Sequence, residues 1–211
     1  MIINPYMFGV SMNIRNSYPF STDAVDIIAG NNGTLTNGAT ITSSSLYCDG
    51  VNDYCIFPNN SFNLTSDFSI SFYFKTYSTG VNYVIFSNFI QIAGNYGIKI
   101  DQRSDNRIRF AIYDGGVGSV VSLETSVFLT TGTYYHVVVT RKFGSRSRIY
   151  IDKTLNASNS NTINPIYYST NYPTVGVSKF NTVSFEQYAN INMYQLKIFN
   201  EELTQTQINA L

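Results

Sequence analysis

The sequence predicts an all-β domain, and two observations carry that prediction. The 211 residues include 17 tyrosines and 15 phenylalanines but only 12% charged residues, a composition that favours strands over helices. Short apolar or alternating segments recur along the chain and are separated by Gly, Asn, Asp and Ser turn signals. A chain of this length can bury a core without disulfides or metals, so we expect one antiparallel sandwich domain.

Charge and hydropathy exclude several classes of partner. Thirteen basic and thirteen acidic residues cancel, which predicts no general attraction to nucleic acid or to anionic membranes. There is no apolar run long enough for membrane insertion as a helix. Residues 1–20 lack the basic start and continuous apolar core of a secretory signal. We expect them to form an edge strand or an arm that docks on a partner chain.

The strand signals can be taken in order. Residues 46–57 place two apolar runs around Asp49-Gly50-Val51-Asn52-Asp53, which predicts a β-hairpin with a tight turn. Phe68–Thr76 alternates between an apolar face and a face that carries Tyr73 and Lys75. Further strands are expected at residues 83–88, 89–93, 96–101, 107–113, 120–124, 132–140, 148–152 and 191–200. Thr204 and Gln207 form a capping-box pattern, which predicts a short helix at the C-terminus.

Several of these segments resemble one family. Asp49–Tyr54 resembles the opening D-G-x-[DN]-D-Y signature of laminin G-like, concanavalin A-like jelly-roll modules. Gly30–Ala39 resembles the turn-rich stretch that commonly precedes this signature in the family. Residues 132–140 (GTYYHVVVT) resemble the family's G-x-W-Y-H-V-A-V-T strand, and residues 191–200 resemble its last strand, with Asn192 in place of the customary Asp. Lys153 stands where Gly is usual, so we expect a different turn there.

The resemblance covers about residues 20–211 and implies a domain organisation. Residues 1–20 are interpreted as the N-terminal arm or edge strand, and residues 21–211 as the laminin G-like jelly-roll domain. The implied fold is an antiparallel two-sheet, concanavalin A-like jelly-roll sandwich with a short C-terminal helix.

Three groups of residues leave alternatives open. Cys48 and Cys55 flank the predicted turn and are either buried thiols in the core or a disulfide across the hairpin. His136 is the only histidine. It is either hydrogen-bonded within the sheet or reaches a ligand face. Arg141, Lys142, Arg146 and Arg148 surround one hairpin, either as a solvated turn or as a contact for an acidic partner.

The acidic residues argue against catalysis. The only glutamates are Glu124, Glu186, Glu201 and Glu202, and none lies in the E-x-D-x-x-E pattern that retaining glucanases of the same general sandwich carry on one strand. We therefore expect no enzyme and no catalytic residue, with a glycoside hydrolase as an unfavoured alternative.

Two binding sites are predicted. Asp49, Asn52 and Asp53 concentrate oxygen ligands that suit Ca²⁺, although the same side chains can cap backbone amides of a turn without metal. A sugar site needs aromatic platforms beside amide groups on loops. The residues that qualify by type are Tyr167, Tyr168, Tyr172, Asn95 and Tyr96.

These observations predict a non-catalytic surface module. The leading hypothesis is an accessory or decoration protein of a virion, such as a phage capsid or tail, with glycan binding. The alternative is a free carbohydrate-binding, lectin-like module. The expected partners are other subunits of a larger assembly, as a homo-oligomer or with virion proteins, and cell-surface glycans. The expected location is a virion surface or the extracellular space.

Overall fold

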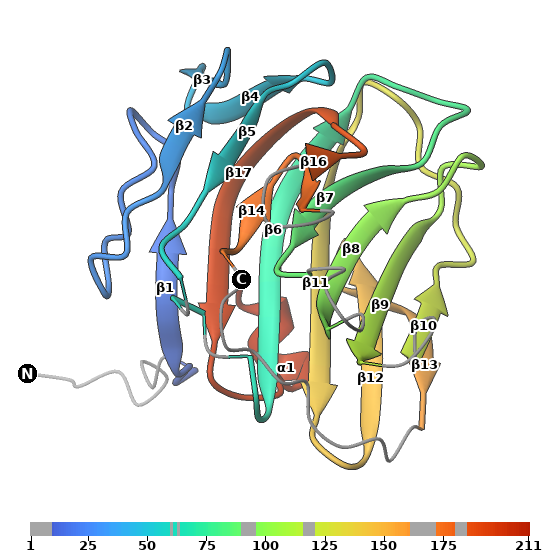
Figure 1. Ribbon diagram of the computed structural model, residues 1–211. Helices are drawn as coiled ribbons and strands as arrows, with labels where there is room; N and C mark the ends of the chain where they lie inside the picture. The colour runs from blue at the N-terminus through green and yellow to red at the C-terminus, as the bar shows by residue number, and fades with distance from the viewer. Residues whose placement is uncertain are drawn as a thin grey trace, which may run out of the picture.

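The computed structural model describes residues 10–59, 61–62, 64–89, 96–115, 121–160, 172–179 and 185–211, which form two antiparallel sheets packed face to face (Figure 1). Sheet A contains, in spatial order, β13 (Thr154–Asn159), β12 (Arg146–Ile151), β11 (Tyr134–Lys142), β6 (Phe68–Thr76), β17 (Asn190–Phe199), β4 (Ser45–Asp49) and β3 (Thr40–Thr42), with β1 (Ile14–Tyr18) also beside β17. Sheet B contains β10 (Val121–Glu124), β9 (Ile108–Asp114), β8 (Tyr96–Gln102), β7 (Tyr83–Ser87), β14 (Thr174–Val175), β5 (Tyr54–Ile56) and β2 (Thr34–Thr36). A separate pair joins β15 (Ser178–Lys179) and β16 (Phe185–Glu186).

The predicted all-β sandwich is confirmed, and strand alternation explains its core. In β6, Phe68, Ile70, Phe72 and Phe74 point between the sheets and are almost completely buried, as the alternation predicts. Burying one such side chain stabilises the fold by about 2 kcal/mol. The intervening residues of β6 lie on the outer face of sheet A. Part of the predicted strand at 89–93 lies outside the described residues.

The predicted hairpin at residues 46–57 is wrong. β4 belongs to sheet A and β5 to sheet B, so the segment between them is a corner that carries the chain from one sheet to the other. Gly50 takes a φ of +84° at this corner. Asp53 is buried, and its carboxylate accepts hydrogen bonds from the backbone amides of Gly38 (2.7 Å) and Asp49 (3.3 Å). The same turn residues suit a hairpin and a corner, which is why the local pattern did not separate the two.

The corner also separates the two cysteines. Cys48 lies in β4 and Cys55 in β5, and both are free thiols with no exposed surface. Burial raises the pKa of Cys48 to about 12 and raises that of Cys55 further. Both therefore pack as small apolar side chains. Of the two alternatives, buried thiols and a disulfide, the structure shows buried thiols.

The C-terminal helix forms as predicted and closes one end of sheet A. In α1 (Gln205–Asn209) the Thr204 hydroxyl accepts a hydrogen bond from the Gln207 backbone amide, and the Gln207 side chain accepts one from the Thr204 amide. Leu203 and Ile208 then pack against Val138 and other apolar residues on the outer face of sheet A. In the turn between β12 and β13, Asp152 and Lys153 adopt φ values of +48° and +68°. Whether this turn differs from that of the family stays a prediction.

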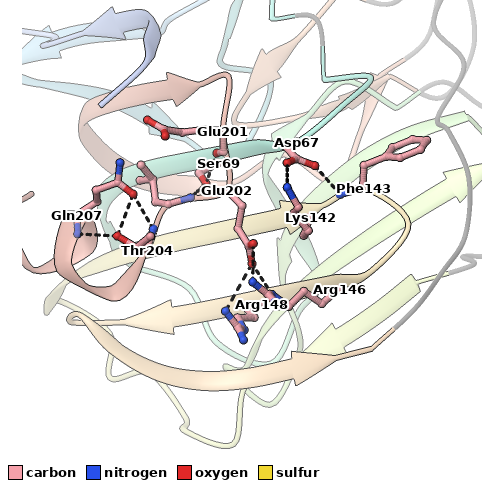
Figure 2. Close-up of polar contacts among 11 residues, drawn as sticks. Asp67, Ser69, Lys142, Phe143, Arg146, Arg148, Glu201, Glu202, Thr204 and Gln207 are labelled. Atoms are coloured by element: carbon pink, nitrogen blue, oxygen red, sulfur yellow. Dashed lines mark hydrogen bonds and ion pairs between the residues drawn. The ribbon is translucent and has the colours of Figure 1, made fainter. Parts of the chain in front are cut away.

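Ion pairs anchor the same end of the sheet (Figure 2). Glu202 accepts two hydrogen bonds from Arg146, at 2.7 and 2.8 Å, and a longer one from Arg148 at 3.5 Å. Asp67 pairs with Lys142 at 2.5 Å. Most of the basic cluster of the 141–148 hairpin is thus engaged by acids of the same chain, which leaves little of its charge for an acidic partner.

At the N-terminal side, β1 pairs antiparallel with β17. Tyr18 and Phe20 are completely buried in the main core. Residues 1–9 lie outside the described residues, so docking of an N-terminal arm on a partner stays a prediction. No helix in the described parts of the chain is both long and apolar enough to cross a membrane.

Candidate functional site

The outer face of sheet A has two halves that differ in composition. One half is covered by α1 and the residues around it. The other half presents tyrosines from four neighbouring strands and from the residue that follows β6. We call this half the tyrosine face and define it by Tyr47, Tyr73, Tyr77, Tyr134, Tyr194, Lys75, Asn190 and Asn192.

Cross-strand register brings the aromatic rings together. Tyr73 in β6 lies opposite His136 in β11 and Tyr194 in β17. Its ring stacks on both neighbours, with centroid distances of 4.3 Å to His136 and 4.8 Å to Tyr194. Tyr134 meets Tyr194 edge to face at 5.2 Å. The result is a continuous aromatic surface across three strands.

A lysine sits among these rings. The Nζ atom of Lys75 lies 4.9 Å from the ring centroid of Tyr77 and 4.7 Å from that of Tyr134. Both distances are within the range of cation–π attraction. Tyr77 and Tyr134 are 44% and 40% exposed, so solvent reaches the rings that hold this cation.

Beside the aromatic surface lies an open hollow of about 540 Å³, lined by Thr42, Tyr47, Tyr77, Asn190 and Asn192. The Tyr77 hydroxyl donates to Asn192 Oδ1 at 2.6 Å, and Asn192 Nδ2 donates to Ser45 Oγ at 2.9 Å. Asn190 Oδ1 has no hydrogen-bond partner among the described residues. Hydroxyl and amide groups therefore adjoin the exposed rings.

His136 supports this face from within the sheet. The residue is 2% exposed, and its Nε2 atom lies 2.8 Å from Ser71 Oγ. Burial, and to a smaller extent the nearby positive charge of Lys153, lowers the pKa of His136 to about 4. The ring is therefore neutral at pH 7. Of the two alternatives, the structure shows a histidine hydrogen-bonded within the sheet.

Oxygen atoms of the three residues predicted to bind calcium accept hydrogen bonds from elsewhere in the chain. Asp49 Oδ1 accepts from the Val51 amide at 2.8 Å, and the Asn52 carbonyl accepts from the Asn37 side chain at 2.6 Å. Asp53 holds the two amides already named. Within the described residues, no three His, Cys, Asp or Glu side chains are grouped closely enough to hold a metal. Calcium at Asp49, Asn52 and Asp53 stays a prediction, and the contacts observed are those of turn capping.

The predicted sugar-binding residues lie elsewhere. Tyr167, Tyr168 and Asn95 are outside the described residues, as is the side chain of Tyr96 at the start of β8. Tyr172 is 42% exposed, and Lys179 Nζ lies 5.0 Å from its ring centroid. That site stays a prediction.

Sequence reasoning placed Tyr73 and Lys75 on the outward side of one strand but did not recognise the tyrosine face. The face is created by pairing between β6, β11 and β17, which are far apart in the sequence but adjacent in the sheet. The outward positions of the strands at 132–140 and 191–200, which hold Tyr134 and Asn192, were the signal that could have found it.

Comparison with solved structures shows the fold. Trypanosoma rangeli sialidase in complex with sialic acid is 14% identical, with a TM-score of 0.74 over 100% of this chain and 35% of that chain. Domain 4 of AbnA, a GH43 extracellular arabinanase from Geobacillus stearothermophilus in complex with arabinotriose, is 15% identical, with a TM-score of 0.74 over 94% of this chain and 98% of that one. The binding domain of botulinum neurotoxin DC in complex with SialylT is 19% identical, with a TM-score of 0.70 over 94% of this chain and 50% of that one. The chain spans only about a third of the sialidase, and at these identities the likeness concerns the fold alone.

Comparison with curated protein sequences gave no match. Nothing in these similarities supports a phage origin, and the virion role stays a prediction. The sequence model described as the concanavalin A-like lectin/glucanases superfamily, Laminin_G_3, matches residues 49–209. That match spans well over half of the sequence and agrees with the two-sheet fold. The chain therefore belongs to this family of concanavalin A-like lectins and glucanases.

Proposed function

We propose that the protein is a non-catalytic carbohydrate-binding module that holds a glycan on the tyrosine face. The observation that carries this proposal is the run of rings from Tyr73 through Tyr194 to Tyr134, beside the hollow that Asn192 lines. A sugar ring has an apolar face of C–H groups and a rim of hydroxyls. Aromatic rings bury the first, while nearby amides and hydroxyls form hydrogen bonds with the second.

The contacts of the glutamates support a non-catalytic role. Glu124 pairs with Arg107 at 2.8 Å, and Glu202 pairs with Arg146 at 2.7 Å. Glu201 accepts a hydrogen bond from the Asn13 amide at 2.5 Å. Glycoside hydrolysis needs a carboxylic acid and a carboxylate on opposite sides of one bond. These three glutamates instead hold strands and loops together.

The similar structures add support at the level of the fold. The arabinanase domain corresponds to this chain over nearly its whole length and was solved with arabinotriose. A glycan-binding face would serve a free lectin-like module. It would serve a subunit of a virion or of another extracellular assembly equally well. Light scattering on the full chain and on a chain lacking residues 1–20 would separate these settings.

Glycan binding by the purified protein tests the proposal. A glycan array would supply ligands, and calorimetry would give dissociation constants for wild type and for Tyr77→Ala and Tyr134→Ala. Each ring is substantially exposed, so its removal should leave the fold intact. We expect binding at least tenfold weaker for each variant, which corresponds to about 1.4 kcal/mol.

Phe128→Ala is the matched control. Phe128 is an exposed aromatic residue, 65% accessible, that lines a different hollow with Leu129 and Tyr135. Its loss should leave the dissociation constant unchanged. A protein that binds no glycan, or one whose affinity survives the loss of both Tyr77 and Tyr134, would contradict the proposal.

A further inference from the structure

We infer that the glycan held on the tyrosine face is acidic, an inference that rests on the proposed function and names its ligand class. Two lysines on the outer face of sheet A carry the inference. Lys75 lies among the tyrosines, and Lys197 lies on the outer face of β17, beyond Tyr194. Neither forms an ion pair with any residue that the structure describes.

The positive charge of Lys75 is not neutralised by an acidic residue of the described chain. The rings of Tyr77 and Tyr134 lie close to its ammonium group. They fix the position of the cation and stabilise it without cancelling its charge. Because the ammonium group has three donors, it can still bind an anion. An aromatic face with a fixed cation suits a sugar that bears a carboxylate or a sulfate.

Lys197 is half-buried and without an acidic partner. Burial lowers its pKa, since removing water disfavours the charged form. Lys197 pairs in register with Ser71 of β6, and Lys75 lies four residues further along β6. At about 3.3 Å per residue, the two positions are about 13 Å apart along the strand. An extended acidic chain lying along β6 would meet both cations, with the Tyr73–Tyr194 stack between them.

The other charged groups near this face are already engaged. Asp152 Oδ1 accepts from the His136 amide at 2.8 Å, and Asp49 Oδ1 accepts from the Val51 amide. Lys153 donates to the Asn209 carbonyl at 2.9 Å. These hydrogen bonds hold the three side chains in place without cancelling their charges. Lys75 and Lys197 are the cations of this face that lack an acidic partner among the described residues.

Matched pairs of acidic and neutral glycans test the inference on the full chain. The probes are oligogalacturonate with its methyl ester, and dextran sulfate with dextran, and calorimetry at low and high salt gives the dissociation constants. We expect at least one acidic member to bind at least tenfold more tightly than its neutral partner, with the difference shrinking at high salt. The pair that shows the larger difference identifies the anionic group.

Lysine-to-methionine variants locate the charge recognition, because methionine keeps much of the apolar stem. Lys75→Met and Lys197→Met should each reduce the ratio of acidic to neutral affinity several-fold. Two controls are Lys142→Met, whose ammonium group pairs with Asp67, and Lys179→Met, which lies over Tyr172. Neither control should alter the preference.

Equal binding of acidic and neutral forms would overturn the inference, as would a preference that only Lys179→Met removes. The proposed function would then still stand if Tyr77→Ala and Tyr134→Ala weaken binding of the neutral glycans. If the wild-type protein binds none of the glycans tested, that result would count against both the inference and the proposed function.

Discussion

The same strands of sheet A run through both halves of its outer face, but the two halves differ in what they contact. The covered half lies under α1, and the open half is the tyrosine face. At one end β17 presents Phe199 to the apolar cluster under α1, and nearby Glu202 lies between Arg146 and Arg148. At the other end β17 presents Asn192 and Tyr194, and the ammonium group of the adjacent Lys75 lies over the rings of Tyr77 and Tyr134. In the covered half the acids neutralise most of the cations, whereas in the open half the rings of Tyr77 and Tyr134 are exposed and Lys75 forms no ion pair with a described residue. Under the proposed function, this difference separates a half that stabilises the fold from a half that is available to a ligand.

The largest expected effect is a loss of stability at acidic pH. It arises from His136, which is buried in the sheet next to the open half. The pKa of His136 is about 4 in the fold and about 6.5 in an unfolded chain. As the pH falls through 6.5 the unfolded chain takes up a proton first. The free energy of unfolding should therefore fall between pH 6.5 and pH 4, by about 3 kcal/mol in total.

Urea unfolding at pH 7 and pH 5 measures this effect. The protein has one histidine, so His136→Gln should flatten the dependence within this window. Wild-type stability that is equal at the two pH values would show that the fold accepts the protonated ring.

The next effect belongs to the covered half. Glu202→Gln leaves Arg146 and Arg148 without a carboxylate, while Glu201→Gln removes only a partner of the exposed Asn13 amide. We expect the first to lower the free energy of unfolding by about 2 kcal/mol and the second by less than about 1 kcal/mol, because Glu202 pairs with two arginines and its side chain is only 9% exposed. Chemical denaturation checks both. Equal effects would mean that the Glu202 ion pairs do not anchor the helix.

The smallest effect is on the stability of the open half. Neither Tyr134 nor Lys75 is buried in a core, so Tyr134→Ala and Lys75→Met should each change the free energy of unfolding by only about 0.5 kcal/mol. Thermal melts beside the binding measurements check this. A large loss of stability would make these residues part of the framework and would blur the distinction between the halves.

Local patterns predicted the strands and the final helix because alternation and capping act over a few residues. They failed at residues 46–57, because the Asp-Gly turn chemistry is the same whether the next strand pairs with the last one or crosses to the other sheet. The Asp53 carboxylate bonds the amide of Gly38, a contact that depends on a segment fifteen residues away. The tyrosine face depends on longer pairings still, between β6, β11 and β17, which no local pattern contains.

Chemical-shift mapping of the labelled protein during a titration with oligogalacturonate tests the central claim most directly. We predict that the amide shifts concentrate on Tyr73, Lys75, Tyr134 and Tyr194, in the open half of sheet A, with little change around α1. Shifts confined to residues 95–96 and 167–172 would contradict this account, and they would place the site on the loops predicted from sequence.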